Sequence, residues 1–302
     1  LWILIANSWM QHPVGYVMKD GRPLLADLWA VVSQEFAILT VLHVLAASYV
    51  VTGFFVMGVS AYQLLRKSHP DLFQRSLRLG LGMALIFGLL VVVEGHMHGS
   101  DLAQKQPAKL ASLEAHWVTQ ERAPIYLLAF PDERLGGNSI EIGPLPGMLS
   151  MLAYHTPAAR VVGLRDIPPD ERPPVLVTFL SFRLMVGLGM AMLALLVVAW
   201  FKRRTLPSNR FLLRLLLWAI PLPYLTCALG WTVSEVGRQP WIVYGLMRTE
   251  DAVSPIDPTQ VAITLVGFIV LYGILGLFGF YLLGRAAVQG PEAPREPGLN
   301  PC

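Results

Sequence analysis

The sequence is short of charge and of cysteine. Only 14% of its 302 residues are Asp, Glu, Lys or Arg, whereas 54% are hydrophobic. A soluble domain carries about 25% charged residues, so this composition excludes an ordinary soluble domain. The two cysteines, Cys227 and Cys302, lie far apart, which excludes a disulfide framework or a zinc site built on cysteine spacing. The net charge of +3 is small and scattered, so nucleic acid is not expected as a partner.

Long apolar runs fill most of the chain instead. Five segments reach the length of about 20 mainly apolar residues that a helix needs to cross a bilayer: 36–65, 76–95, 175–201, 211–234 and 260–284. Residues 1–10 (LWILIANSWM) are typical of the end of one more helix, so we expect a fragment that lacks upstream spans. The predicted fold class is all-α, a polytopic transmembrane helical bundle of five full spans and a partial first span.

Positive charge predicts the orientation of these spans. Lys and Arg gather after the first, third and fifth full spans, and the positive-inside rule makes that side cytoplasmic. Segments 11–35, 96–174 and 235–259 then lie outside. In the first of these, apolar residues at helical spacing predict a short surface helix over Leu24–Glu35. We divide the chain into a membrane domain, 1–285, and a disordered cytoplasmic tail, 286–302, which is rich in Pro, Gly and charge.

Of seven histidines, only His43 lies within a predicted span. A polar side chain in hydrocarbon is costly and is therefore a functional candidate. Helical spacing places Ala46, Ala47 and Val50 on the face of His43, where small residues leave room for a flat porphyrin. The alternative is a histidine hydrogen-bonded across helices.

Met185, in SFRLM, is a second candidate because Gly189 clears space one turn further along. A rise of about 1.5 Å per residue puts Met185 about 15 Å, and His43 about 10 Å, from the outer ends of their spans. His and Met form a recognised axial pair for an electron-transfer haem. The alternative is a methionine that fills the core. Arg183 lies between the two in depth and either pairs with a haem propionate or extends toward the interface.

The run GWTVSEVGRQPW places Trp231, Glu235 and Arg238 on one helix face, at i, i+4 and i+7. A carboxylate in this setting suits a metal ligand or a proton carrier. The alternative is a solvated carboxylate with Arg238 as its surface partner.

The outer segment QPAKLASLEAHW carries Lys109 and Glu114. Glu114 is a candidate proton acceptor for a substrate that loses protons on oxidation, and a nearby Lys109 would hold the carboxylate charged. The alternative is an ordinary surface helix. His96 adds a titratable group where the loop leaves the membrane.

The motifs WILIANSWMQHPVG, QPAKLASLEAHW, SFRLM and GWTVSEVGRQPW, in this order with the His43 context, resemble subunit I of cytochrome bd-type quinol oxidases. The resemblance covers essentially the whole chain. It implies that His43 and Met185 ligate a low-spin haem b. It also implies that Glu235 ligates a high-spin haem b, with Arg238 beside it and Trp231 between the haems.

The same resemblance implies a quinol-binding loop over 96–174. Lys109 and Glu114 match the quinol-binding pair of the family, and His96 matches a position that some members fill with an acid. Five further residues match the family pattern without an assigned role: Asn7, Trp9, Met10, Gln11 and Pro13.

The activity implied is that of a ubiquinol or menaquinol oxidase of the bacterial cytoplasmic (inner) membrane. Quinol is oxidised at the outer face, and electrons pass through the haems b to haem d, where oxygen becomes water. The expected partners are a second large oxidase subunit and a small single-span subunit. Family members have further helices before the position of Leu1, which carry the axial histidine of haem d, so this sequence alone is expected to lack full activity.

Two other classes of protein remain as alternatives. A secondary transporter usually shows paired broken helices in two related halves, and the sequence has no such pattern. A membrane diheme electron carrier needs several histidines within its spans, and here there is only His43.

Overall fold

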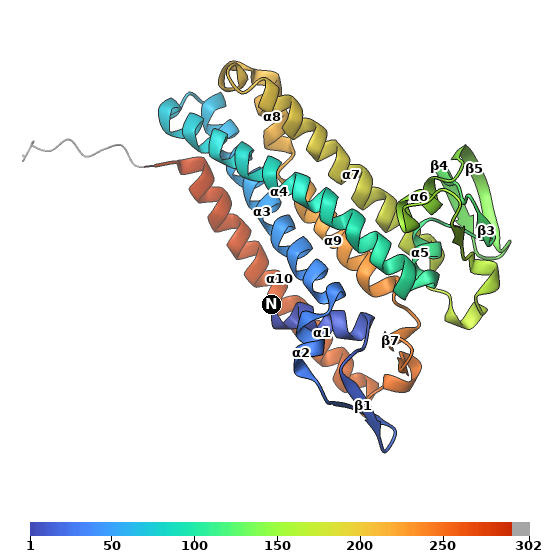
Figure 1. The fold of residues 1–302 in the computed structure, drawn as a ribbon. Coiled ribbons are helices and arrows are strands. Elements are labelled where there is room, and N and C mark those ends of the chain that lie inside the picture. The colour runs from blue at the N-terminus through green and yellow to red at the C-terminus, as the bar shows by residue number, and fades with distance from the viewer. Residues whose placement is uncertain (292–302) are drawn as a thin grey trace, which may run out of the picture.

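The computed structural model describes residues 1–291 as a long helical bundle with a folded layer at one end (Figure 1). Five helical segments are long and apolar enough to cross a membrane. They are α3 (Glu35–Leu65), α4 (Pro70–Lys105), α7 (Val175–Phe201), the consecutive helices α8 (Arg210–Trp218) and α9 (Pro221–Val236), and α10 (Pro258–Gln289). These confirm the five predicted spans, and α1 (Trp2–Gln11) is a ten-residue helix where the partial span was predicted.

Two predicted boundaries need correction. Helix α4 continues to Lys105, ten residues past the predicted end of its span, so His96 lies on a helix and not in a loop. Helix α10 continues to Gln289, so the first residues of the predicted tail are helical. The rest of that tail, 292–302, lies outside the described residues.

The predicted surface helix over Leu24–Glu35 is wrong in its first half. Strands β1 (Tyr16–Lys19) and β2 (Arg22–Leu25) form an antiparallel hairpin. Its two turn residues, Asp20 and Gly21, have positive φ, which is the backbone of a type I′ turn. Helix α2 (Leu28–Ser33) begins only afterwards, where the Asp27 side chain accepts a hydrogen bond from the Ala30 N–H at 3.0 Å.

The segment between α4 and α7 is a compact layer of short elements. Helix α5 (Pro107–Leu113) follows α4 at once, and α6 (Met148–Tyr154) packs back onto α4. Strand β3 (Gln120–Glu121) pairs with β6 (Arg160–Val161), and β4 (Ile125–Asp132) pairs with β5 (Gly137–Leu145), both antiparallel. The remaining short elements are η1 (Leu164–Asp166), η2 (Pro169–Glu171), η3 (Leu206–Ser208), β7 (Trp241–Val243), β8 (Met247–Arg248) and η4 (Glu250–Ala252).

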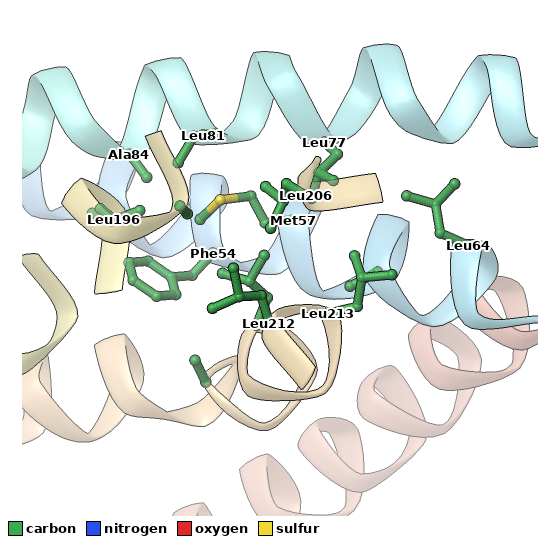
Figure 2. Close-up of a cluster of buried hydrophobic side chains, with 14 of the residues drawn as sticks. Phe54, Met57, Leu64, Leu77, Leu81, Ala84, Leu196, Leu206, Leu212 and Leu213 are labelled. Atoms are coloured by element: carbon green, nitrogen blue, oxygen red, sulfur yellow. The ribbon is translucent and has the colours of Figure 1, made fainter. Parts of the chain in front are cut away.

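The apolar core lies in the half of the bundle away from this layer. Helices α3 and α4 approach closely because Gly53 faces Ala84: a β-carbon on Gly53 would lie only 2.7 Å from that of Ala84. Figure 2 shows Phe54 and Met57 of α3 packed among leucines of the neighbouring helices. By contrast, no residue of α10 is buried, as expected for a helix that faces lipid or further protein.

The two ends of the bundle differ in charge. The connection between α3 and α4, helix α8 and the end of α10 lie together at one end, and the outer layer lies at the other (Figure 1). The connections rich in Arg and Lys therefore share one end, which agrees with the predicted orientation.

Candidate functional site

His43, on α3, is held by a carboxylate from the neighbouring helix. Its Nδ1 donates to Oε2 of Glu94 on α4. The ring also lies beside Gly95, where a β-carbon would sit 3.5 Å from Cε1. The structure thus confirms the alternative, a histidine bonded across helices, and this bond occupies Nδ1 alone. With the proton on Nδ1, Nε2 is the nitrogen that carries a lone pair for a metal.

Glu94 is the contact that the sequence did not reveal. Its side chain is 11% exposed. The second oxygen, Oε1, has no hydrogen-bond partner among residues 1–291 and lies 3.8 Å from Nδ1 of His98, one turn further along α4. The only sign in the sequence was an acidic residue at the predicted end of a span.

Met185, on α7, lies against α9. Its sulfur is 3.2 Å from the place that a β-carbon would take on Gly230, so a larger residue there would displace the thioether. Gly189, one turn on, has open space around its α-carbon. Both features fit a thioether that is left accessible on a face cleared of bulk.

A cavity of about 80 Å³ lies between α3, α4, α7 and α9. Ala47, Gly189 and Thr226 line it, and they lie one helical turn from His43, Met185 and Gly230 respectively. The cavity is therefore adjacent to both candidate ligands and is walled mainly by small and apolar side chains. This lining is chemically suited to the apolar face of a macrocycle, which His43 and Met185 would ligate. The distance between His43 and Met185 themselves stays a prediction.

Glu235, near the outer end of α9, is held by two donors. Oε1 accepts from Nδ2 of Asn7 on α1 at 2.7 Å, and Oε2 accepts from Nη2 of Arg238. Arg238 is buried, so it is not the exposed surface partner of the alternative interpretation. Trp231, one turn earlier, is exposed on the same helix. Glu235 is a fixed, half-exposed carboxylate that fits a metal ligand, and Asn7 now has a structural role.

Lys109, on α5, is almost completely buried, which rules out an ordinary surface helix. Its Nζ donates to Oε1 of Gln11 and to the carbonyl of Ser234, both at 3.1 Å. Burial, together with the nearby charge of Arg238, lowers the pKa of Lys109 to about 7, and the Glu235 charge opposes that fall.

Glu114 follows α5 directly and points to α7. It accepts a hydrogen bond from Nη2 of Arg183 at 2.5 Å, and its side chain is 10% exposed. Burial raises the pKa of Glu114 to about 7, and the Arg183 charge opposes that rise. The prediction that Lys109 holds this carboxylate is wrong, because five helical residues place the two side chains on different sides of α5. Arg183 performs that role.

His96 lies on the outer part of α4 and packs against His155, which ends α6. The ring centroids are 5.2 Å apart at a steep angle. The structure thus attaches His96 to the outer layer, and its predicted contact with quinol stays a prediction.

The fold and the site define a class of protein. The chain is a multi-pass membrane protein. In its outer layer, Lys109 contacts α9 and Glu114 contacts α7, the helices that carry the candidate haem ligands Glu235 and Met185. The model of the cytochrome bd terminal oxidase subunit I family matches residues 1–291, and the chain belongs to this family.

Individual relatives agree with this assignment. Cytochrome bd ubiquinol oxidase subunit 1 of Bacillus subtilis is 36% identical over 96% of this chain and 65% of its own length. Cytochrome bd-II ubiquinol oxidase subunit 1 of Escherichia coli is 27% identical over 97% of this chain and 70% of its own length. The solved bd oxidase of Geobacillus thermodenitrificans matches with a TM-score of 0.87 and 31% identity, covering 96% of this chain and 67% of that one. The chain spans about two thirds of the length of these relatives.

Proposed function

We propose that this chain is the haem-binding subunit of a membrane quinol:oxygen oxidoreductase that oxidises quinol at its outer face. The observation that carries the proposal is the ion pair of Glu114 and Arg183, because it joins the outer layer to α7 two residues before Met185. The two relatives compared by sequence are named as ubiquinol oxidases, which supports a quinol as the substrate class.

Two groups of residues would hold haems b. Nε2 of His43 and the sulfur of Met185 would ligate the low-spin haem, with Glu94 holding the proton of His43 on Nδ1. The Glu235 carboxylate would ligate the high-spin haem, with Arg238 and Asn7 fixing its orientation. A haem bound at these sites supplies one-electron redox chemistry.

Glu114 is suited to accept a proton from quinol. A pKa of about 7 leaves it partly ionised at neutral pH, which is the condition under which a general base works best. Its ion pair with Arg183 keeps the carboxylate fixed in a water-poor layer.

Lys109 is suited to bind a ring oxygen of the quinol. A protonated lysine has three N–H donors, and Gln11 and Ser234 accept two of them. Among residues 1–291 no acceptor takes the third donor, which would bind the ligand. The proposal further includes haem d as the site of oxygen reduction, a second large subunit as partner, a small single-span subunit, and the bacterial cytoplasmic membrane as location.

The test compares Glu114→Gln with Glu121→Gln, an exposed glutamate on β3. Both variants are purified within the oxidase complex, and quinol oxidation and the haem spectrum are measured. We expect Glu114→Gln to slow quinol oxidation by about a hundredfold or more, as for loss of a general base, with haem content unchanged. Full activity of Glu114→Gln, or equal losses in both variants, would refute the proposed role.

A further inference from the structure

A groove opens between α4 and α7 at the end of the bundle opposite the outer layer. Its volume is about 640 Å³, and it is lined by residues of α4 between Arg78 and Phe87, by Trp200 near the end of α7 and by Arg203 just after it. A β-carbon on Gly82 would meet nothing within 4 Å, so the floor of the groove is open there.

Two arginines lie at the mouth of this groove. Arg78 and Arg203 are exposed, and among residues 1–291 neither forms an ion pair with a carboxylate. The guanidinium of Arg203 lies 4.8 Å from the ring centroid of Trp200, and its Nη1 donates to the Trp200 carbonyl at 3.2 Å. Trp200 therefore holds Arg203 in place and leaves other N–H donors of the guanidinium available.

Below the arginines the lining is apolar. Leu79, Met83, Ile86 and Phe87 continue along α4. A rise of about 1.5 Å per residue carries this wall on the order of 13 Å deeper than Arg78. The groove thus has a cationic mouth at the interface and a hydrocarbon wall behind it.

We propose that this groove binds a phospholipid with an anionic headgroup. The phosphodiester lies between Arg78 and Arg203, because a guanidinium fork binds phosphate oxygens through parallel N–H bonds. One acyl chain follows the apolar wall past Gly82. The arginine mouth of the groove lies at the end of the bundle opposite the outer layer, and none of the groove residues is a proposed haem ligand or quinol contact, so the proposal does not depend on the proposed function.

The test uses the purified oxidase complex and native mass spectrometry. Retention is titrated with phosphatidylglycerol, with phosphatidylcholine of the same acyl chains and with inorganic phosphate alone. Three variants are compared: Arg78→Gln with Arg203→Gln, Gly82→Leu, and the control pair Arg210→Gln with Arg214→Gln. The control removes two exposed arginines that the orientation places on the same side but that do not line the groove.

We expect the wild-type complex to retain phosphatidylglycerol in preference to phosphatidylcholine. Loss of both groove arginines should weaken retention about thirtyfold. Each interfacial charge contributes about 1 kcal/mol to lipid binding, and the two contributions add. Gly82→Leu should weaken it also, and the control pair should leave it unchanged. Equal retention of the two lipids, an equal loss in the control pair, or binding of inorganic phosphate that Gly82→Leu does not affect would overturn the proposal.

Discussion

The hydrogen bond between Glu94 and His43 predicts how a haem on this histidine would behave. Replacing Glu94 with Gln keeps the size of the side chain and an oxygen that accepts from Nδ1, but removes the charge. The Glu94 carboxylate is mostly buried, and its second oxygen has no hydrogen-bond partner among the described residues. Its main polar contact is therefore the bond to His43, and the effect of removing its charge should be felt mainly there.

The expected magnitude follows from this geometry. A hydrogen bond to a charged group contributes about 1.5–3 kcal/mol. Loss of an outer partner of a metal-bound histidine typically costs about 10- to 100-fold in metal affinity, which is the same range. A carboxylate on Nδ1 also makes the imidazole a stronger donor, which favours ferric iron. We therefore expect Glu94→Gln to raise the midpoint potential of the low-spin haem by on the order of 60 mV, one decade for one electron.

The assay is a spectroscopic redox titration of the purified complex, with haem content from the pyridine haemochrome. The matched control is Asp101→Asn, since Asp101 lies on the same helix, is similarly buried and pairs with Lys105 at 2.5 Å. Glu94→Gln with the haem content and potential of the wild type would show that Glu94 does not act on the ligand. If Asp101→Asn shifts the midpoint potential by the same amount, the effect comes from the loss of a nearby negative charge in general and not from the hydrogen bond to His43.

Three further outcomes are expected. Met185→Leu should abolish the low-spin haem band in reduced-minus-oxidised spectra while the protein still inserts, and an unchanged band would exclude Met185 as a ligand. Arg183→Gln should move the acid limb of the pH profile of quinol oxidation to higher pH by about one to three units, because Arg183 lowers the pKa of Glu114 and its loss raises the pH at which the base is free. Arg183→Lys keeps the positive charge and should restore much of the original pH profile. An acid limb that stays in place in Arg183→Gln would contradict the pairing of Arg183 with Glu114. Gly53→Leu should lower the free energy of unfolding by about 1–3 kcal/mol through overpacking against α4. The control Gly187→Leu places its side chain in open space and should leave the free energy of unfolding unchanged. Thermal unfolding of the solubilised complex measures both variants.

The sequence predicts the spans well because bilayer thickness sets a length that apolar runs must reach. It predicted the outer hairpin poorly. Leu24 and Leu25 fitted a helical period, but Asp20 and Gly21 just before them are the residues that a type I′ turn needs. A local turn decided the structure there, and the apolar spacing was incidental.

The sequence indicated candidate site residues but not their pairings. The motifs identified Lys109, Glu114 and His43. Their partners come from distant positions: Glu94 is 51 residues from His43, and Arg183 is 69 residues from Glu114. A single sequence contains no signal for such contacts, because they depend on which helices become neighbours. The identification of Lys109 as the partner of Glu114 failed for this reason.

The corrected pairings give α5 a particular position in the molecule. Lys109 reaches the Ser234 carbonyl on α9, next to Glu235, whereas Glu114 reaches Arg183 on α7, close to Met185. Because a helix turns by about 100° per residue, five residues separate these two directions by about 140°. Helix α5 and the residue that follows it therefore contact both helices that carry the proposed haem ligands, through Lys109 on one side and Glu114 on the other. Under the proposed function, a quinol bound at α5 would lie where loss of its protons changes the charge next to both of these helices, so proton release and electron transfer would share one structural element.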